Sequence, residues 1–368
     1  MKKLLSFLLV SCLLVGLFSG CRLKDSRTVI NVYNWGQYMS DGSDGYLDVI
    51  AEFERQNPDI RVNYVTFDSN ETMYSKMANG GITVDVIIPS DYMVGRLIED
   101  DMLRPLNFDN IPNYANIDPE YIQRSQAFDP SNQYSVPYAW GSVGIIYNSK
   151  YVAEEDVVGW DLLWNEKYAG KILMFDNSRD AFCIAQCLLG IENINTTDPQ
   201  ELLACAKKLE EQRPVVQQYI MDQVFDLMEN EEAWIAPYYA GDYLTMAEEN
   251  ENLCFYLPEE EGYNLFIDSM CIPSCCENKE AAERFINFLC DPEIGGSNMD
   301  WICYGTPIKT DLVRPYMDEE VLDDPTAYPP AEVQAKGKGY IALPRETTRL
   351  MEELFMQVRN GIPVHLPD

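Results

Sequence analysis

Short apolar segments that suit β-strands alternate with amphipathic segments that suit helices along most of this chain. Residues 28–35 and 61–67 are expected strands, and residues 46–56 between them carry Leu47, Ile50 and Phe53 at helical spacing. Further strands are expected at residues 84–88, 144–147, 171–175, 233–236 and 253–257, and helices at 199–211 and 278–289. This alternation predicts an α/β fold with largely parallel sheets.

The first twenty-one residues have the layout of an export signal. Lys2 and Lys3 precede an almost wholly apolar stretch at residues 4–18, and Ser19-Gly20 supplies small residues before Cys21. The stretch is too short and wrongly flanked for a membrane span. Its end resembles a bacterial lipobox, which implies that residues 1–20 are a signal peptide and that Cys21 is lipidated. The alternative is an ordinary cleaved signal followed by an incidental cysteine.

The length and charge of the chain narrow its possible partners. With 368 residues, it is long enough for two domains with separate cores. Sixty Asp and Glu residues against 27 Lys and Arg give a net charge of −33. This field repels a phosphate backbone, so we expect no nucleic-acid partner, whereas it attracts cations. The acidic excess has a second interpretation, which is that it keeps an extracellular protein soluble.

Nine cysteines follow Cys21, and their number and spacing argue against a metal site. Nine is odd, the run from Cys271 to Cys276 has no second cluster at zinc-ligand spacing, and the only histidine is His365. Most have apolar neighbours, so we interpret them as small buried hydrophobic residues. One or two disulfides remain compatible with the sequence. For an exported protein, free thiols would suggest a low-oxygen setting.

Signatures of catalysis are absent from the sequence. There is no glycine-rich phosphate loop and no dinucleotide fingerprint. A nucleophile–histidine arrangement would have to use His365, four residues from the C-terminus. We therefore expect a protein that is not an enzyme and that has no metal or other cofactor.

Aromatic and acidic residues recur just beyond the expected strands. Because ligands of open α/β sheets bind beyond the carboxyl ends of strands, these residues are candidates for one cleft. Phe266 and Asp268 are two apart in an extended-looking stretch, so both side chains would face the same way. Carboxylates bind ammonium groups, and aromatic faces cover methylene chains and add cation–π attraction of ~0.5–2 kcal/mol each. The candidates after strands are Trp35, Tyr38, Ser90, Tyr92, Asp180, Tyr239 and Asp242.

Short strings across the chain resemble bacterial spermidine/putrescine-binding proteins, in the order found in that family. Among them are Val-Tyr-Asn-Trp-Gly-Gln-Tyr at 32–38, Pro-Ser-Asp-Tyr at 89–92 and Ser-Val-Pro-Tyr-Ala-Trp-Gly at 135–141. Later ones are Thr-Asp-Pro at 197–199, Ile-Asp-Ser at 267–269 and Tyr-Gly-Thr-Pro at 304–307.

The resemblance implies a type II periplasmic-binding-protein fold, with two α/β lobes and a cleft between them. Family crossovers near Gly141 and Phe266 imply a first lobe of residues 27–141 plus 267–310 and a second lobe of residues 142–266 plus 311–368. The implied function is to capture spermidine or putrescine outside the cytoplasm, in the periplasm or on the outer face of the cytoplasmic membrane, for an ABC importer. The implied partners are the permease and ATPase subunits. We expect a monomer attached to the membrane only by its lipid.

Position by position, the resemblance implies which residues contact the ligand, and it shows two positions where this chain differs from its spermidine-preferring relatives. The implied ligand-binding residues are Trp35, Tyr38, Ser90, Tyr92, Asp180, Tyr239, Asp242, Phe266, Asp268 and Tyr304. Asn177 replaces an aspartate used by spermidine-preferring relatives, and Ile341 stands where they have glutamine. Asp242 resembles an acidic residue of the putrescine-preferring branch. The choice between the two amines therefore stays open.

Two other functions fit a chain of this kind. Related two-lobed receptors bind ferric iron with adjacent tyrosines, and Tyr238-Tyr239 is such a pair. Neighbouring residues on a strand face opposite sides, so one tyrosine is expected in the cleft and the other in the core. The second alternative is a surface adhesin or sensor that uses the same fold without transport.

Overall fold

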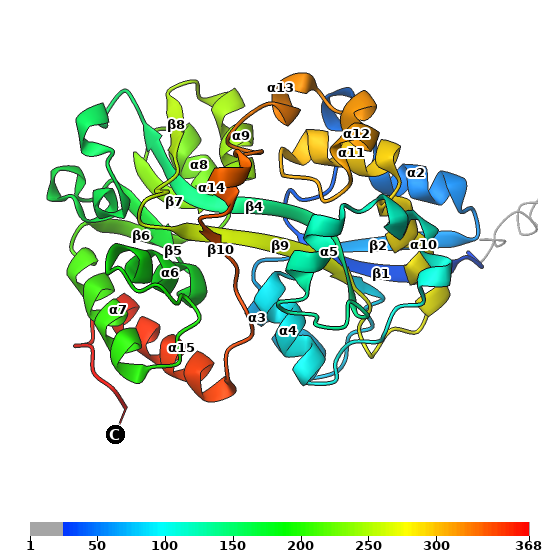
Figure 1. The fold of residues 1–368 in the computed structure, drawn as a ribbon, viewed down its shortest axis with the longest axis horizontal. Coiled ribbons are helices and arrows are strands. Elements are labelled where there is room, and N and C mark those ends of the chain that lie inside the picture. Colours follow the sequence, from blue (N-terminus) through cyan, green and yellow to red (C-terminus); the bar gives the residue numbers. More distant parts are fainter. Residues whose placement is uncertain (1–24, 368) are drawn as a thin grey trace, which may run out of the picture.

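A computed structural model describes residues 25–367, so the predicted signal peptide and Cys21 lie outside the described residues. Within residues 25–367 the strands form one ten-stranded sheet with helices on both sides (Figure 1). No helix in this range is both long and apolar enough to cross a membrane. The strands are β1 Thr28–Trp35, β2 Ile60–Phe67, β3 Val86–Ile87, β4 Ser135–Asn148, β5 Ile172–Phe175, β6 Val216–Ile220, β7 Ile235–Tyr239, β8 Leu253–Tyr256, β9 Tyr263–Cys271 and β10 Gly337–Lys338.

Helices cover this sheet, and several begin at a side-chain cap that the sequence supplies. Asp48, Asn177 and Asp198 each accept a hydrogen bond from a backbone N–H in the first turn of the helix that follows. The helices are α2 Val49–Gln56, α3 Asn70–Ala78, α4 Asp91–Glu99, α5 Pro119–Ser125, α6 Ser178–Leu188, α7 Pro199–Gln212, α8 Val224–Glu229, α9 Ala240–Glu249, α10 Lys279–Leu289, α11 Pro292–Ile302, α12 Thr310–Val313, α13 Glu319–Leu322, α14 Ala331–Gln334 and α15 Arg345–Asn360.

The sheet has two halves that share two long strands. The order β2-β1-β3-β9-β4-β7-β5-β6 places β1 to β3 in one half and β5 to β7 in the other. Pairing is parallel among β2, β1 and β3, and again among β7, β5 and β6. Strands β4 and β9 run antiparallel to each other through the centre (Figure 1). Strand β9 also pairs with β3 of the first half, and β4 also pairs with β7 of the second half. The α/β fold with two lobes is confirmed, and the antiparallel centre adds to what alternation predicted.

Several expected segments begin or end elsewhere. The helix expected from residue 46 begins at Val49, because Asp48 caps it. The strand expected at 84–88 pairs only at Val86–Ile87, and the one expected at 144–147 is the end of the fourteen-residue β4. The strand expected at 233–236 begins at Ile235 and extends to Tyr239, so Tyr239 is its last residue rather than a residue beyond it.

The nine cysteines of the described range are all free thiols. Seven of them are buried, Cys254 is half-buried and Cys275 is exposed. Most therefore pack as small hydrophobic residues, as their apolar neighbours predicted.

Candidate functional site

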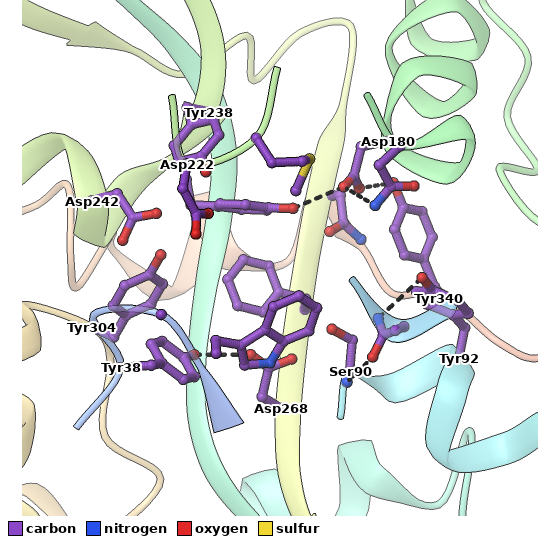
Figure 2. Close-up of a pocket in the computed structure, with 18 residues that line it drawn as sticks. Tyr38, Ser90, Tyr92, Asp180, Asp222, Tyr238, Asp242, Asp268, Tyr304 and Tyr340 are labelled. Atoms are coloured by element: carbon purple, nitrogen blue, oxygen red, sulfur yellow. Dashed lines mark hydrogen bonds between the residues drawn. The ribbon is translucent and has the colours of Figure 1, made fainter. Parts of the chain in front are cut away.

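The ends of strands from both halves of the sheet surround one cavity (Figure 2). The cavity has a volume of about 70 Å³, which suits a slender ligand or a few water molecules. All ten residues predicted to bind ligand line it: Trp35, Tyr38, Ser90, Tyr92, Asp180, Tyr239, Asp242, Phe266, Asp268 and Tyr304. No lysine, arginine or histidine of the described chain is among the lining residues.

Asp268 lies on β9, where that strand passes between the halves of the sheet. Its side chain and that of Phe266 both face the cavity, as their two-residue spacing predicted. The hydroxyl of Tyr38 donates to Asp268 Oδ2 at 2.9 Å, while the buried Oδ1 has no hydrogen-bond partner among the described residues. Burial raises the pKa of this carboxyl to about 7, although hydrogen bonds from Ser90 and Tyr38 oppose the rise.

Asp180 lies in the first turn of α6, on the opposite side of the cavity from Asp242 (Figure 2). Tyr239 Oη and Asn177 Nδ2 donate to its Oδ2, and Tyr340 Oη donates to its Oδ1, each at 2.9 Å. Burial raises the pKa of Asp180 to about 6, and the hydrogen bonds from Tyr239 and Tyr340 and the charge of Arg179 oppose this rise. Asn177, one of the two departures from the family pattern, thus caps α6 and orients this aspartate.

Asp242 lies in the first turn of α9, where the N-terminal end of the helix dipole favours a negative charge. Burial nevertheless raises its pKa to about 7, and the charges of Asp222 and Asp268 add to that rise. A hydrogen bond with Tyr304 opposes it. Asp222 and Asp242 lie on the same side of the cavity in Figure 2. The cavity therefore has carboxylates on two sides and one between them.

Aromatic rings form the walls between these carboxylates. Tyr38 and Tyr304 pack edge to face with centroids 5.0 Å apart, and Phe266 packs edge to face on Tyr239 at 5.5 Å. Such faces can cover the methylene groups of a ligand and attract its cationic nitrogens. The apolar walls also exclude water, which is why the carboxyl pKa values are raised.

Ser90 and Tyr92 sit at the start of α4. Ser90 forms an isolated antiparallel bridge with Asp268, so it fixes the backbone beside that carboxylate. Asn70 Nδ2 donates to the hydroxyl of Tyr92 at 3.0 Å, and this hydroxyl donates to Glu71 Oε1 at 3.0 Å. The Tyr92 ring is thereby held against the cavity.

Sequence reasoning missed several lining residues. Tyr340 follows no strand-like segment, and Asp222 follows β6, whose exposed Gln217 and Gln218 hid the strand. Ile341, the other noted departure, is absent from the lining, and its neighbour Tyr340 faces the cavity instead. The residues that line the cavity beyond the ten predicted ones are Gly36, Asn70, Asn177, Met221, Asp222, Tyr238, Asn264 and Tyr340.

The tyrosine pair matches the expected arrangement in part. Tyr239 reaches Asp180, and Tyr238 also lines the cavity, although its ring stacks on Phe175 with centroids 5.6 Å apart. Tyr238 is thus in the core, as expected for one of the pair, but it also contributes to the cavity wall. Within residues 25–367 no group of three His, Cys, Asp or Glu residues is placed to hold a metal ion.

Known proteins are similar to this chain in sequence and in fold. Residues 48–329 match the model of the family described as bacterial extracellular solute-binding protein. The spermidine/putrescine-binding periplasmic protein of Escherichia coli is 31% identical over 339 residues, which cover 92% of this chain and 93% of that protein.

Two solved structures are similar over nearly the whole described chain. The spermidine/putrescine ABC transporter substrate-binding protein PotD of Streptococcus pneumoniae has a TM-score of 0.75 at 34% identity, covering 90% of this chain and 99% of that one. The TpPotD lipoprotein of Treponema pallidum has a TM-score of 0.77 at 25% identity, covering 91% and 99%. The resemblance drawn from short strings is confirmed, and so is the prediction of a binding protein rather than an enzyme. This chain belongs to the bacterial extracellular solute-binding protein family.

Proposed function

We propose that the protein captures spermidine, putrescine or both in this cavity and delivers the amine to an ABC importer. The observation that carries the proposal is the set of three aspartates, the buried Asp180 and Asp268 and the half-buried Asp242, in a cavity that no basic residue of the described chain lines. Buried carboxylates without a counter-charge are costly, and a cationic ligand removes that cost. The names of the relatives point to the same ligands.

The arrangement of groups supports a linear amine rather than a compact cation. Carboxylates on two sides of the cavity would each take a terminal ammonium through charge-assisted hydrogen bonds, and Asp268 would take a nitrogen between them. Asp268 Oδ1 is a buried carboxylate oxygen without a hydrogen-bond partner among the described residues, so it can accept from such a nitrogen. Tyr38, Phe266 and Tyr304 would cover the methylene chain between the nitrogens.

Closure of two lobes would complete the site. We place the crossings in β4 near Gly141 and in β9 near Phe266, which leaves residues 27–141 and 267–310 in one lobe and 142–266 in the other. Contacts of α12 and the turn at Arg314–Tyr316 with α11 favour extending the first lobe to residue 316. The rest of the chain, with α15 packed on α6 and α7, would complete the second lobe.

Delivery to an importer requires the protein to be located close to the importer's outer face. We propose that Cys21 carries a lipid that holds a monomer at the outer face of the cytoplasmic membrane, beside the permease and ATPase subunits of the importer. The lipoprotein from Treponema pallidum supports this anchoring. Radiolabelled palmitate incorporation that disappears in Cys21→Ser would test it.

Calorimetric titration of the protein without residues 1–21 tests the amine ligand directly. Putrescine or spermidine should bind with Kd of about 1 µM or tighter. Asp268→Asn should weaken binding at least tenfold, since an ammonium loses its buried counter-charge. Asp226→Asn, on the exposed side of α8, is the matched control and should bind like the parent. Absence of binding by either amine would refute the proposed function, and unchanged binding by Asp268→Asn would refute the site.

A further inference from the structure

Asp222 is the cavity-lining carboxylate that has no assigned role. It lies in the turn between β6 and α8, and it is exposed, unlike the buried Asp180 and Asp268 and the half-buried Asp242. An aspartate just before a helix commonly caps it. Here α8 begins without a side-chain cap, and no described residue donates a hydrogen bond to the Asp222 carboxylate. Helix capping therefore does not explain this residue.

The Asp222 carboxylate reaches the opposite half of the molecule. A Cβ atom built at Gly36, which follows β1, would lie 3.1 Å from Asp222 Oδ2. Glycine at position 36 thus leaves room for a carboxylate that comes from the turn after β6. Asp222 lines the cavity from the second half of the sheet, and Trp35 and Gly36 line it from the first half.

The neighbours of Asp222 are acidic. Burial raises the pKa of Asp222, and the charge of Asp68 adds to that rise. Burial likewise raises the pKa of Asp242, and the charge of Asp222 adds to that rise. Figure 2 shows Asp222 beside Asp242 and Tyr304, away from Asp180. Two like charges are held close together at this side of the cavity without a basic residue among its lining. A small cation with several N–H donors would relieve their repulsion.

We propose that Asp222 is a specificity-determining residue that, with Asp242, holds one terminal ammonium of the ligand. The inference rests on the proposed amine-binding function. Asp242 binds this nitrogen from the buried side and Asp222 from the rim, over Gly36. The pair selects ligands whose nitrogen at this end is charged, and it rejects those whose nitrogen is neutral.

Ligands that differ only in the charge of one end test this selection. Spermidine and its two monoacetylated forms would be titrated into the protein without residues 1–21, which retains the described fold. The parent should prefer spermidine to both acetylated forms. Asp222→Asn should weaken spermidine binding about tenfold, and it should shrink the preference over one acetylated form by a similar factor, because that form places its neutral end at Asp222.

Asp68→Asn is the matched control, since it removes the same charge nearby from a residue that does not line the cavity. It should change the affinities for all three ligands by the same small factor. If Asp222→Asn also leaves both preference ratios unchanged, the inference is overturned while the proposed function stands. If the parent binds none of the three ligands, the proposed function fails and the role of Asp222 fails with it.

Discussion

Two buried carboxylates from different regions of this molecule, Asp129 and Asp268, differ in their partners. Asp129, before β4, accepts hydrogen bonds from the backbone N–H groups of Tyr134 and Ser135 at 2.8 and 3.1 Å and from the Ser135 hydroxyl at 3.0 Å. Asp268 in the cavity accepts a hydrogen bond from the Tyr38 hydroxyl, and its other oxygen has no partner within residues 25–367. The first carboxylate organises its own loop, whereas the second is left for a ligand. A buried acid thus indicates a site only when the protein itself fails to satisfy it.

Removing the self-satisfied carboxylate should have the largest effect on stability. Asp129→Ala leaves several buried donors unpaired, so we expect the free energy of unfolding to fall by about 3–5 kcal/mol. The midpoint of urea unfolding would measure the loss. Calorimetry on the folded fraction should still give the parent affinity for amine. A variant as stable as the parent would show that the Asp129 carboxylate does not stabilise its own loop.

Acidification should affect the cavity carboxylates through binding. The pKa values of Asp180, Asp242 and Asp268 without ligand are about 6, 7 and 7, and a bound ammonium favours their charged forms. Amine nitrogens stay protonated throughout this range. Affinity should therefore fall as the pH drops from 8 to 5.5, by about 1000-fold or more if all three carboxylates must be charged in the complex.

The same linkage predicts proton release when amine binds at pH 7. Titrations in buffers with different ionisation enthalpies should give different observed enthalpies, and the difference should fade at pH 8.5. An affinity that stays constant from pH 8 to 5.5 would show that these carboxylates do not meet the charged nitrogens.

Without ligand, the charged carboxylates of the cavity should lower the free energy of unfolding of the protein. The pKa of Asp242 in the fold, about 7, lies above its usual value of 3.8, so its contribution to stability is present at low pH and lost as the pH rises through 7. Asp242→Asn should therefore stabilise the ligand-free protein at pH 8, by about 2 kcal/mol, and have less effect at pH 5. Thermal unfolding at both pH values would measure this, and a variant less stable than the parent at pH 8 would contradict it.

The smallest expected effect is that of a single hydroxyl. Tyr38→Phe removes the donor to Asp268 Oδ2 while the ring stays, so the amine affinity should fall about fivefold, equivalent to ~1 kcal/mol. Tyr74→Phe removes a hydroxyl that donates to Asp100 outside the cavity, and it serves as the control. Equal affinities of the two variants would show that Tyr38 does not orient Asp268 for the ligand.

The sequence predicted the cavity better than the strands that build it. Trp35, Ser90 and Asp268 lie within strings that resemble the family, so each could be located without its strand. Strand β4 was predicted only at its end because it is buried along nearly all of its length, which removes the alternation that marks a half-buried strand.

Local sequence patterns could not predict the cavity residues that come from distant segments of the chain. Tyr340 reaches Asp180 from a segment without regular periodicity, and Asp222 follows a short strand with polar residues. The antiparallel pairing of β4 with β9 was likewise hidden, because strand direction depends on tertiary contacts that a local pattern does not contain.

The shared central strands also affect when the molecule can fold. Strand β3 has its antiparallel neighbour in β9, where Ile87 pairs with Cys271, so the first half of the sheet stays incomplete until most of the chain has been synthesised. Non-local pairing of this kind slows folding. If the chain is exported through a translocation channel, as its first twenty residues predict, slow folding would give it time to pass before the native fold forms.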